Sequence, residues 1–188
     1  MSNLNTKCFE SAWQLIFRLK EDGHLDDEES MMLIHKYLLE CCRRIWSLLP
    51  DSGSRKGVEA AEKYCSGKIS WSEASEMDWY SEASAFLFEN GDDTDPDISQ
   101  YLCQINSKKE EIGNLLVPPR EIVSAGVKDL LMDAAYFANE ALNFPFISGG
   151  TPSSREESMR NIGKFLPLDL LNKMVPISLL SKIGEKNA

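Results

Sequence analysis

Apolar residues recur along most of this chain at intervals of three and four positions, the spacing that gives an α-helix one apolar side. Between residues 26 and 49 this pattern covers a wide arc, formed by Ile34, Leu38, Cys41, Ile45 and Leu49. Val and Thr are scarce, and no segment alternates apolar and polar residues long enough to indicate a strand. The sequence therefore predicts an all-α fold, with the helix over residues 26–49 at the centre of a bundle.

Glycines, prolines and acidic turns divide the chain into about seven predicted helices. Gly23 and Gly67 each follow a helix, and Ser70 begins a capping box that opens another. An acidic turn over residues 90–97 separates two more. The predicted helices cover about residues 5–22, 26–49, 55–65, 70–89, 98–116 and 120–143, with a seventh starting near residue 153 and short helices after Pro167 and Pro176.

The length of the chain fits one domain. It has 188 residues, of which 43% are hydrophobic and 27% charged, as in an ordinary globular protein. Residues 145–153 have the composition of a linker, but too few residues follow for an independent core. We therefore expect a single helical domain over residues 1–188. Residues 153–188 are a candidate C-terminal appendage, and we expect its apolar residues to pack on the chain's own core, with docking on a second copy as the alternative.

Net charge limits the partners of the chain. There are 20 Lys and Arg against 30 Asp and Glu, a formal net charge of −10, which disfavours binding to nucleic acid or to an anionic membrane. No apolar run approaches the roughly 20 residues of a membrane-spanning helix, and the first residues lack the pattern of a secretory signal. Five cysteines without paired spacing indicate reduced thiols. We expect a soluble cytoplasmic protein.

Residues suited to catalysis or metal binding are few. His24 and His35 are the only histidines, and the sequence has no zinc, di-iron, nucleotide-binding or serine-hydrolase motif. Cys41 and Cys42 point about 100° apart on a helix, so they are poorly placed to chelate one ion. We therefore predict no catalytic residue, metal site or cofactor. The alternative is a small hydrolase or transferase in which His35 acts with Cys42 or with a remote carboxylate.

Charge is distributed unevenly along the chain, and this is its most informative feature. Residues 69–107 contain nine acidic residues and no Lys or Arg, whereas residues 41–68 carry a net charge of +3. This surplus of carboxylates predicts a surface that attracts and orients a basic protein. The alternative is an ordinary solvated surface, neutralised by the basic segment folding against it. The residues that we assign to the acidic surface are Glu73, Glu76, Asp78, Glu82, Asp92, Asp93, Asp95 and Asp97.

A second candidate surface lies on the predicted helix over residues 120–143. Apolar residues fill one side of this helix, and the opposite side carries a tyrosine among carboxylates, a combination that suits a protein interface. These residues are Asp129, Asp133, Tyr136 and Glu140. We expect their side chains to be exposed to solvent.

One stretch resembles a known group of proteins. It consists of Cys41-Cys42-Arg43-Arg44-Ile45-Trp46, Leu48-Leu49, Ser54-Arg55, Val58-Glu59, Ala61-Glu62-Lys63-Tyr64 and Gly67. Residues 41–68 are in this respect similar to a segment of uncharacterised helical proteins of bacteria, several of them from planctomycetes. The resemblance implies a bacterial origin and a helical fold, and it brings no activity or site residue with it. From the residues themselves we expect a helical hairpin, with Arg43 or Arg44 reaching Glu59 or Glu62.

Together these features favour a protein that binds another protein over an enzyme. An immunity- or antitoxin-like inhibitor of a basic effector is one concrete form of this prediction. The alternatives are the enzyme that uses His35 and a structural subunit that forms a homo-oligomer through its apolar tail.

Overall fold

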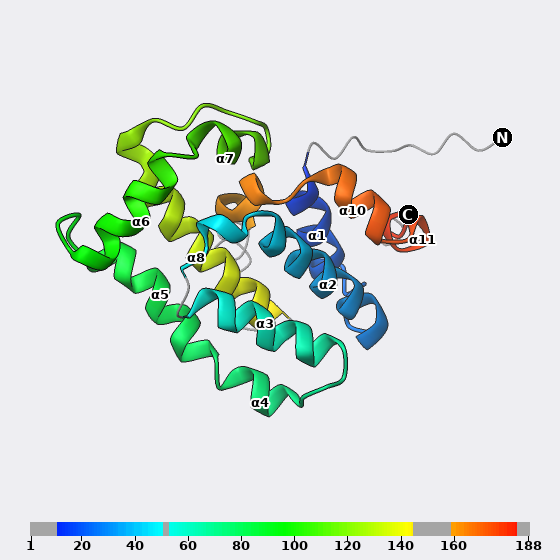
Figure 1. The fold of residues 1–188 in the computed structure, drawn as a ribbon. Coiled ribbons are helices and arrows are strands. Elements are labelled where there is room, and N and C mark those ends of the chain that lie inside the picture. The colour runs from blue at the N-terminus through cyan, green and yellow to red at the C-terminus, as the bar shows by residue number, and fades with distance from the viewer. Residues whose placement is uncertain (1–10, 51–52, 145–158, 184–188) are drawn as a thin grey trace.

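The computed structural model describes residues 11–50, 53–144 and 159–183, and Figure 1 shows how they are arranged. All regular structure in these ranges is helical, which confirms the all-α prediction. The α-helices described there are α1 (Ala12–Glu21), α2 (Glu28–Arg44), α3 (Ser54–Cys65), α4 (Trp71–Ser75), α5 (Asp78–Asn90), α6 (Pro96–Asn106), α7 (Lys109–Leu115), α8 (Val127–Asn143), α10 (Leu168–Met174) and α11 (Ile177–Leu180). Short 3₁₀ helices lie at Trp46–Leu48, Ser124–Gly126 and Gly163–Phe165.

Of the ten α-helices in the described ranges, α10 and α11 are the short helices predicted after Pro167 and Pro176, and the other eight stand where six were predicted. The predicted helix over residues 70–89 is interrupted at Glu76 and Met77, and the one over residues 98–116 is interrupted at Ser107 and Lys108. Each break lets the chain change direction so that both halves reach the core. The start of the predicted seventh helix, near residue 153, lies outside the described residues.

The predicted helix over residues 120–143 begins later than expected, at Val127. The segment after Pro119 instead folds back on α7, where the backbone N–H of Arg120 donates to the carbonyl oxygen of Gly113 over 3.1 Å. A side chain on Gly113 would not fit, because its Cβ would lie 2.3 Å from the carbonyl oxygen of Arg120. Backbone groups that pair across this turn are not available to a helix.

Most of the predicted helix ends agree with the structure. Gly23 and Gly67 have positive φ angles of 72° and 69°, the left-handed conformation that ends a helix and suits glycine. Asp27 accepts a hydrogen bond from the backbone N–H of Ser30 at the start of α2. Ser70 and Glu73 form the predicted capping box at the start of α4.

Helix α8 takes the central position that we expected for the second helix. It contacts α2, α3, α4, α5 and α6, and Figure 1 shows it surrounded by these elements. Small residues make this possible, since alanine side chains allow several helix axes to come close to α8. The buried alanines of α8 are Ala134, Ala135, Ala138 and Ala141.

Helix α5 comes very close to the start of α3. A Cβ on Gly53 would lie 1.9 Å from the carbonyl oxygen of Tyr80, and one on Gly57 would lie 3.1 Å from the side chain of Ser81. The side of α5 that meets α3 and α8 is lined by small buried residues, including Ser81 and Ala85. Only small side chains fit on that side where α5 passes Gly53 and Gly57, and the one large residue buried there, Phe88, lies near the C-terminal end of the helix.

The apolar C-terminal part packs on the rest of the chain over much of its described length. The ring of Phe165 stacks on that of Phe137 in α8, with centroids 5.5 Å apart. The hydroxyl of Tyr37 in α2 donates to the carbonyl oxygen of Pro167 over 3.2 Å, and Leu171 is fully buried. Ile177 in α11 is an exception, with 78% of its surface exposed. None of the helices in the described ranges has the length and apolar content needed to cross a membrane.

Replacing Gly53 with Ala is expected to lower the free energy of unfolding by about 1–3 kcal/mol, because the added methyl group collides with the backbone of α5. Urea denaturation followed by circular dichroism measures this change. Gly126→Ala is the matched control, since the nearest heavy atom to its added Cβ is 4.0 Å away. Equal stability of the two variants would contradict the close contact between Gly53 and α5.

Candidate protein-interaction surface

Several of the predicted acidic residues have a role inside the fold. Asp78 is half-buried and accepts hydrogen bonds from the side-chain amides of Asn139 and Asn143 in α8, over 3.0 and 2.6 Å. The hydroxyl of Tyr136 in α8 donates to Glu89 over 2.7 Å. Asp78 and Glu89 therefore attach the two ends of α5 to α8. For Asp78 this corrects the prediction of an outward recognition residue.

The acidic turn between α5 and α6 is organised by its own carboxylates. Asp92 accepts from the backbone N–H and the hydroxyl of Thr94, and these bonds lower the pKa of Asp92. Asp95 is the N-cap of α6 and accepts from the backbone N–H of Asp97. Asp93 forms an ion pair with Lys128 of α8 over 3.1 Å. Lys128, which lies outside residues 69–107, thus partly neutralises the negative charge of this turn.

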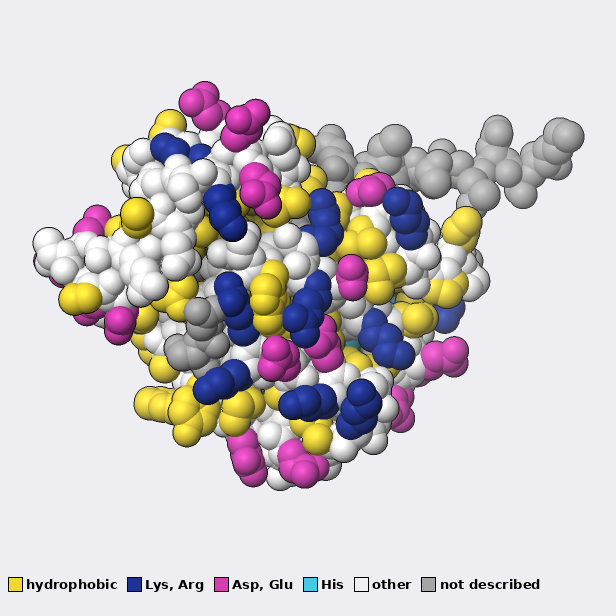
Figure 2. All heavy atoms as spheres, in the orientation of Figure 1, with side chains coloured by type: hydrophobic (Ala, Val, Ile, Leu, Met, Phe, Trp, Pro, Cys, Tyr) yellow, Lys and Arg dark blue, Asp and Glu magenta, His cyan; other side chains and the backbone are white. Residues whose placement is uncertain are grey.

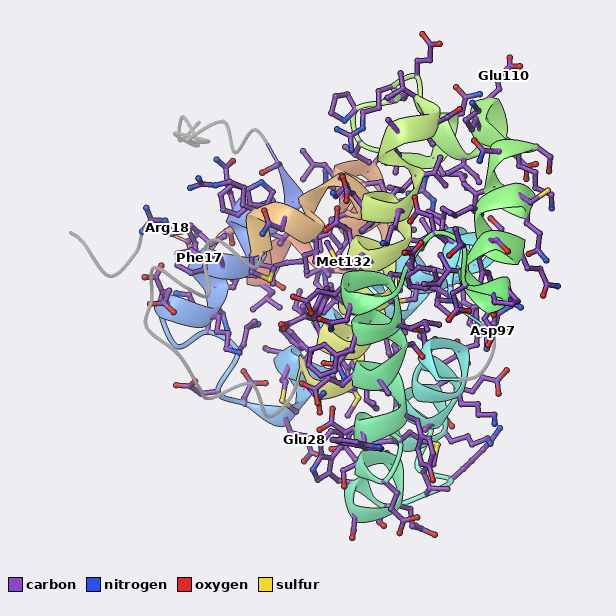
Figure 3. The ribbon with its side chains drawn as sticks, turned by 90° about the vertical axis from the view of Figure 1, so that its left-hand side faces the viewer. Phe17, Arg18, Glu28, Asp97, Glu110 and Met132 are labelled. Atoms are coloured by element: carbon purple, nitrogen blue, oxygen red, sulfur yellow. The ribbon has the colours of Figure 1, made fainter. Side chains whose placement is uncertain are left out.

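Other predicted acids point into solvent. Glu76 and Asp97 are exposed, and Glu82 is half-buried along the outer edge of α5. Glu73 is also exposed, and its bonds to Ser70 in the capping box lower the pKa of its carboxyl group. Figure 3 looks straight at α5, with Asp97 on one side of it and Met132 of α8 on the other. The outward acids therefore come from separate elements: Glu73 from α4, Glu82 from α5 and Asp97 from α6.

The most unusual feature of α5 is its apolar outer side, which the sequence analysis missed. Trp79 is 71% exposed, Tyr80 57% and Phe86 41%. At about 100° per residue, Trp79, Ala83 and Phe86 fall on one line along the helix, directly opposite the buried side. The sequence did contain a signal for this exposed apolar side, because the segment is apolar on both sides of the helix. Such a pattern is typical of a helix that is buried all round or of one that binds a partner.

The two edges of this aromatic line carry different kinds of side chain. Glu82 and Glu89 lie on the edge next to α8, where Glu89 meets Tyr136. Tyr80 and Leu87 lie on the edge next to α3, where the backbone of Tyr80 meets Gly53. We call the whole outer side of α5 the α5 surface; it consists of Trp79, Ala83 and Phe86 with Tyr80, Leu87, Glu82 and Glu89 at its edges.

The second predicted surface, on α8, is mostly engaged within the fold. Asp129 is exposed as expected, but Asp133 forms a half-buried ion pair with Lys164. Tyr136 bonds Glu89, and burial together with this bond raises the pKa of its hydroxyl to about 12. Glu140 is half-buried, and burial raises the pKa of its carboxyl group. The expectation of full exposure is therefore wrong for Asp133, Tyr136 and Glu140, because neighbouring elements cover this side of α8.

His35 does not meet Cys42, the cysteine named in the hydrolase or transferase alternative. Its Nδ1 lies 3.3 Å from the Sγ of Cys65 at the end of α3, while Cys42 is fully buried in the core. Burial lowers the pKa of His35 to about 4 and raises the pKa of Cys65 to about 11. Near pH 7 the pair is a neutral imidazole beside a neutral thiol, whereas a nucleophilic cysteine has to be a thiolate.

The other thiols and the basic segment have structural surroundings. Burial raises the pKa of Cys41 to about 12. No three His, Cys, Asp or Glu side chains in the described ranges are arranged to hold a metal ion. Arg43 binds Glu62 through two hydrogen bonds of 2.7 and 2.6 Å, as the predicted helical hairpin requires, and its guanidinium lies 3.9 Å from the ring centroid of Trp46.

Comparisons of the chain with protein-family models, curated proteins and solved structures found no match. The bacterial origin and family that residues 41–68 suggest therefore stay predictions.

Lowering the pH is expected to destabilise the protein through His35. Its pKa is about 4 in the folded chain and has the ordinary histidine value of 6.5 in the unfolded chain, so between these pH values only the unfolded chain gains the proton. The free energy of unfolding should fall by up to about 3 kcal/mol from this group as the pH drops from 7 to 4. Urea denaturation of wild type and His35→Gln over this range measures the difference.

His24→Gln is the control, because His24 lies in a surface turn and bonds the carbonyl oxygen of Lys182. A pH dependence that is the same with and without His35 would contradict the assignment.

Cys65 is expected to react slowly with iodoacetamide near pH 7.5, because its thiol is half-buried and its pKa is raised to about 11. Exposed Cys103 provides the internal comparison, and peptide mass spectrometry resolves the two sites. Cys103 should be modified at least about 10-fold faster. Faster modification of Cys65, lost in His35→Ala, would instead identify an activated nucleophile and support the hydrolase or transferase alternative.

Proposed function

We propose that this chain is a protein-binding module that contacts its partner through the α5 surface. The observation that carries the proposal is the exposure of Trp79, Tyr80 and Phe86 on a single helix. Tryptophan, tyrosine and phenylalanine are enriched in protein interfaces, where their large rings supply most of the contact area. A soluble protein that leaves three such rings in water gains free energy when a partner covers them.

The charges around the rings define the kind of partner. Residues 69–107 contain no Lys or Arg, and Glu76, Glu82 and Asp97 point outward from this stretch. A partner that presents lysines or arginines beside an apolar patch would pair with these carboxylates and place cations on the aromatic rings. A partner that places carboxylates against these acids would be repelled. An inhibitor of a basic effector is one protein of this type.

A neutralised variant tests the proposal. This triple variant combines Glu76→Gln, Glu82→Gln and Asp97→Asn. It removes the charge of three outward acids and breaks no hydrogen bond of the fold described above. The control variant, Glu110→Gln, Glu111→Gln, Glu121→Gln, removes the same charge from exposed acids elsewhere. Each tagged full-length chain is used to capture proteins from extract of its native cell, and the dissociation constant of the purified partner is then measured.

We expect wild type and control to bind the same protein and the neutralised variant to bind it at least about 10-fold more weakly. Binding by wild type should also weaken as salt rises from about 0.05 to 0.5 M, because salt screens exposed charges. Circular dichroism establishes that all three chains are folded. Equal binding by the three chains would refute the proposed function.

A further inference from the structure

Helix α3 lies beside α5 and brings positive charge to the same side of the molecule. One side of α3 faces α4 and α5. On this side Gly57 meets Ser81 of α5, and the ring of Tyr64 meets that of Trp71 in α4. Lys56 and Lys63 are exposed between this side and the solvent. Of the two carboxylates of α3, Glu62 lies toward α2, where Arg43 holds it, and Glu59 is exposed on the outer side of the helix.

Three kinds of side chain therefore follow one another across this side of the molecule. Lys56 and Lys63 of α3 come first, the rings of Trp79 and Tyr80 come next, and Glu82 on the edge toward α8 comes last. Figure 2 shows hydrophobic side chains gathered at the lower left, over the beginning of α5, with Lys and Arg side chains beside them along α3. Figure 3 shows α3 on one side of α5 and α8 on the other.

The geometry points to a second copy of this chain as the partner of the α5 surface, in a two-fold symmetric dimer. This inference rests on the proposed function and names its partner. A two-fold axis running along the aromatic line would place the rings of one copy on those of the other. It would also place Lys56, which lies level with the first turns of α5, against Glu82 of the second copy, and the reverse contact would follow from symmetry.

The order of the three zones is what makes the surface complementary to itself. In a two-fold interface, a contact between one residue of the first copy and another residue of the second copy is repeated with the two copies exchanged. When the axis runs along the aromatic line, a row that runs basic, aromatic, acidic therefore pairs opposite charges at both ends. The aromatic middle would form the dehydrated core, where rings contribute most to binding. A surface with one sign of charge around its rings would repel its own copy.

The overall charge works against this dimer at long range. Each chain has a net charge of −10, and two such chains repel one another in dilute salt. At about 0.15 M salt the screening length is about 8 Å, so charges on the far sides contribute little and the contacts across the interface decide the outcome. The dimer should therefore form near physiological salt and weaken at about 0.01 M.

A charge exchange tests the pairing of α3 with α5. In Lys56→Glu and in Glu82→Lys both ends of the interface bring like charges together, so each single variant should dimerise at least about 10-fold more weakly than wild type. The double variant Lys56→Glu, Glu82→Lys restores opposite charges and should recover most of the affinity. Analytical ultracentrifugation of the full chain at about 0.15 M salt, from about 5 to 500 µM, measures the dissociation constants.

Trp79→Ser tests the aromatic middle and should also weaken the dimer at least about 10-fold. Ile177→Ser is its matched control, because Ile177 is equally exposed but belongs to α11 at the C-terminal end. We expect the control to dimerise like wild type, and circular dichroism to show the same helix content in both.

Either of two results would overturn the inference: a wild type that stays monomeric throughout this concentration range, or a dimer that Trp79→Ser and the single charge variants leave unchanged. Failure of the dimer is distinguishable from failure of the proposed function. A monomeric chain that still binds a different protein through Glu76, Glu82 and Asp97 removes only the second copy as the partner. Equal capture by the neutralised and control variants removes the proposed function itself.

Discussion

The close contact of α5 with α3 and α8 determines the character of the surface of this protein. Glycine at positions 53 and 57 and small residues such as Ser81 and Ala85 allow the helices to approach until side chains larger than these would collide. The first two turns of α5 present small residues to the inner side and bulky residues such as Trp79 to the outer side, whereas Phe88 is buried near the C-terminal end of the helix. The packing of the core thus places Trp79 and Phe86 in solvent.

Polar contacts then hold α5 in one orientation on α8. Asp78 at its first turn meets two asparagines of α8, and Glu89 at its last turn meets Tyr136. Hydrogen bonds at both ends of a helix oppose rotation about its axis, since rotation would leave half-buried polar groups unpaired. The same contacts divide the acidic residues of α5 into those that stabilise the fold and those that meet solvent, and this division defines the acidic edge of the α5 surface.

Burial also decides the chemistry of the thiol–imidazole pair formed by Cys65 and His35. His35 and Cys65 come from separate helices and lie within hydrogen-bonding distance, an arrangement that in an exposed cleft would suit a nucleophile. In this fold the low polarity around them disfavours both charged forms, so the imidazole loses basicity and the thiol loses acidity. Proximity alone does not produce reactivity when the surroundings do not stabilise charge.

Much of the local structure was predictable because it depends on neighbours in the sequence. Helical periodicity, the capping box at Ser70, the glycine helix ends and the separation of acidic from basic segments are all properties of short stretches, and the structure has each of them. The hairpin contact between Arg43 and Glu62 was predictable for the same reason, since a short turn brings its two helices together.

The tertiary structure alone decided which side of α5 is buried, which acids are internal and which cysteine meets His35. A helix that is apolar on both sides gives no local preference between them; the choice here follows from glycines and alanines of α3 and α8 that permit close approach on one side only. Distances between helices far apart in the sequence depend on the packing of the whole core, and no short segment contains that information.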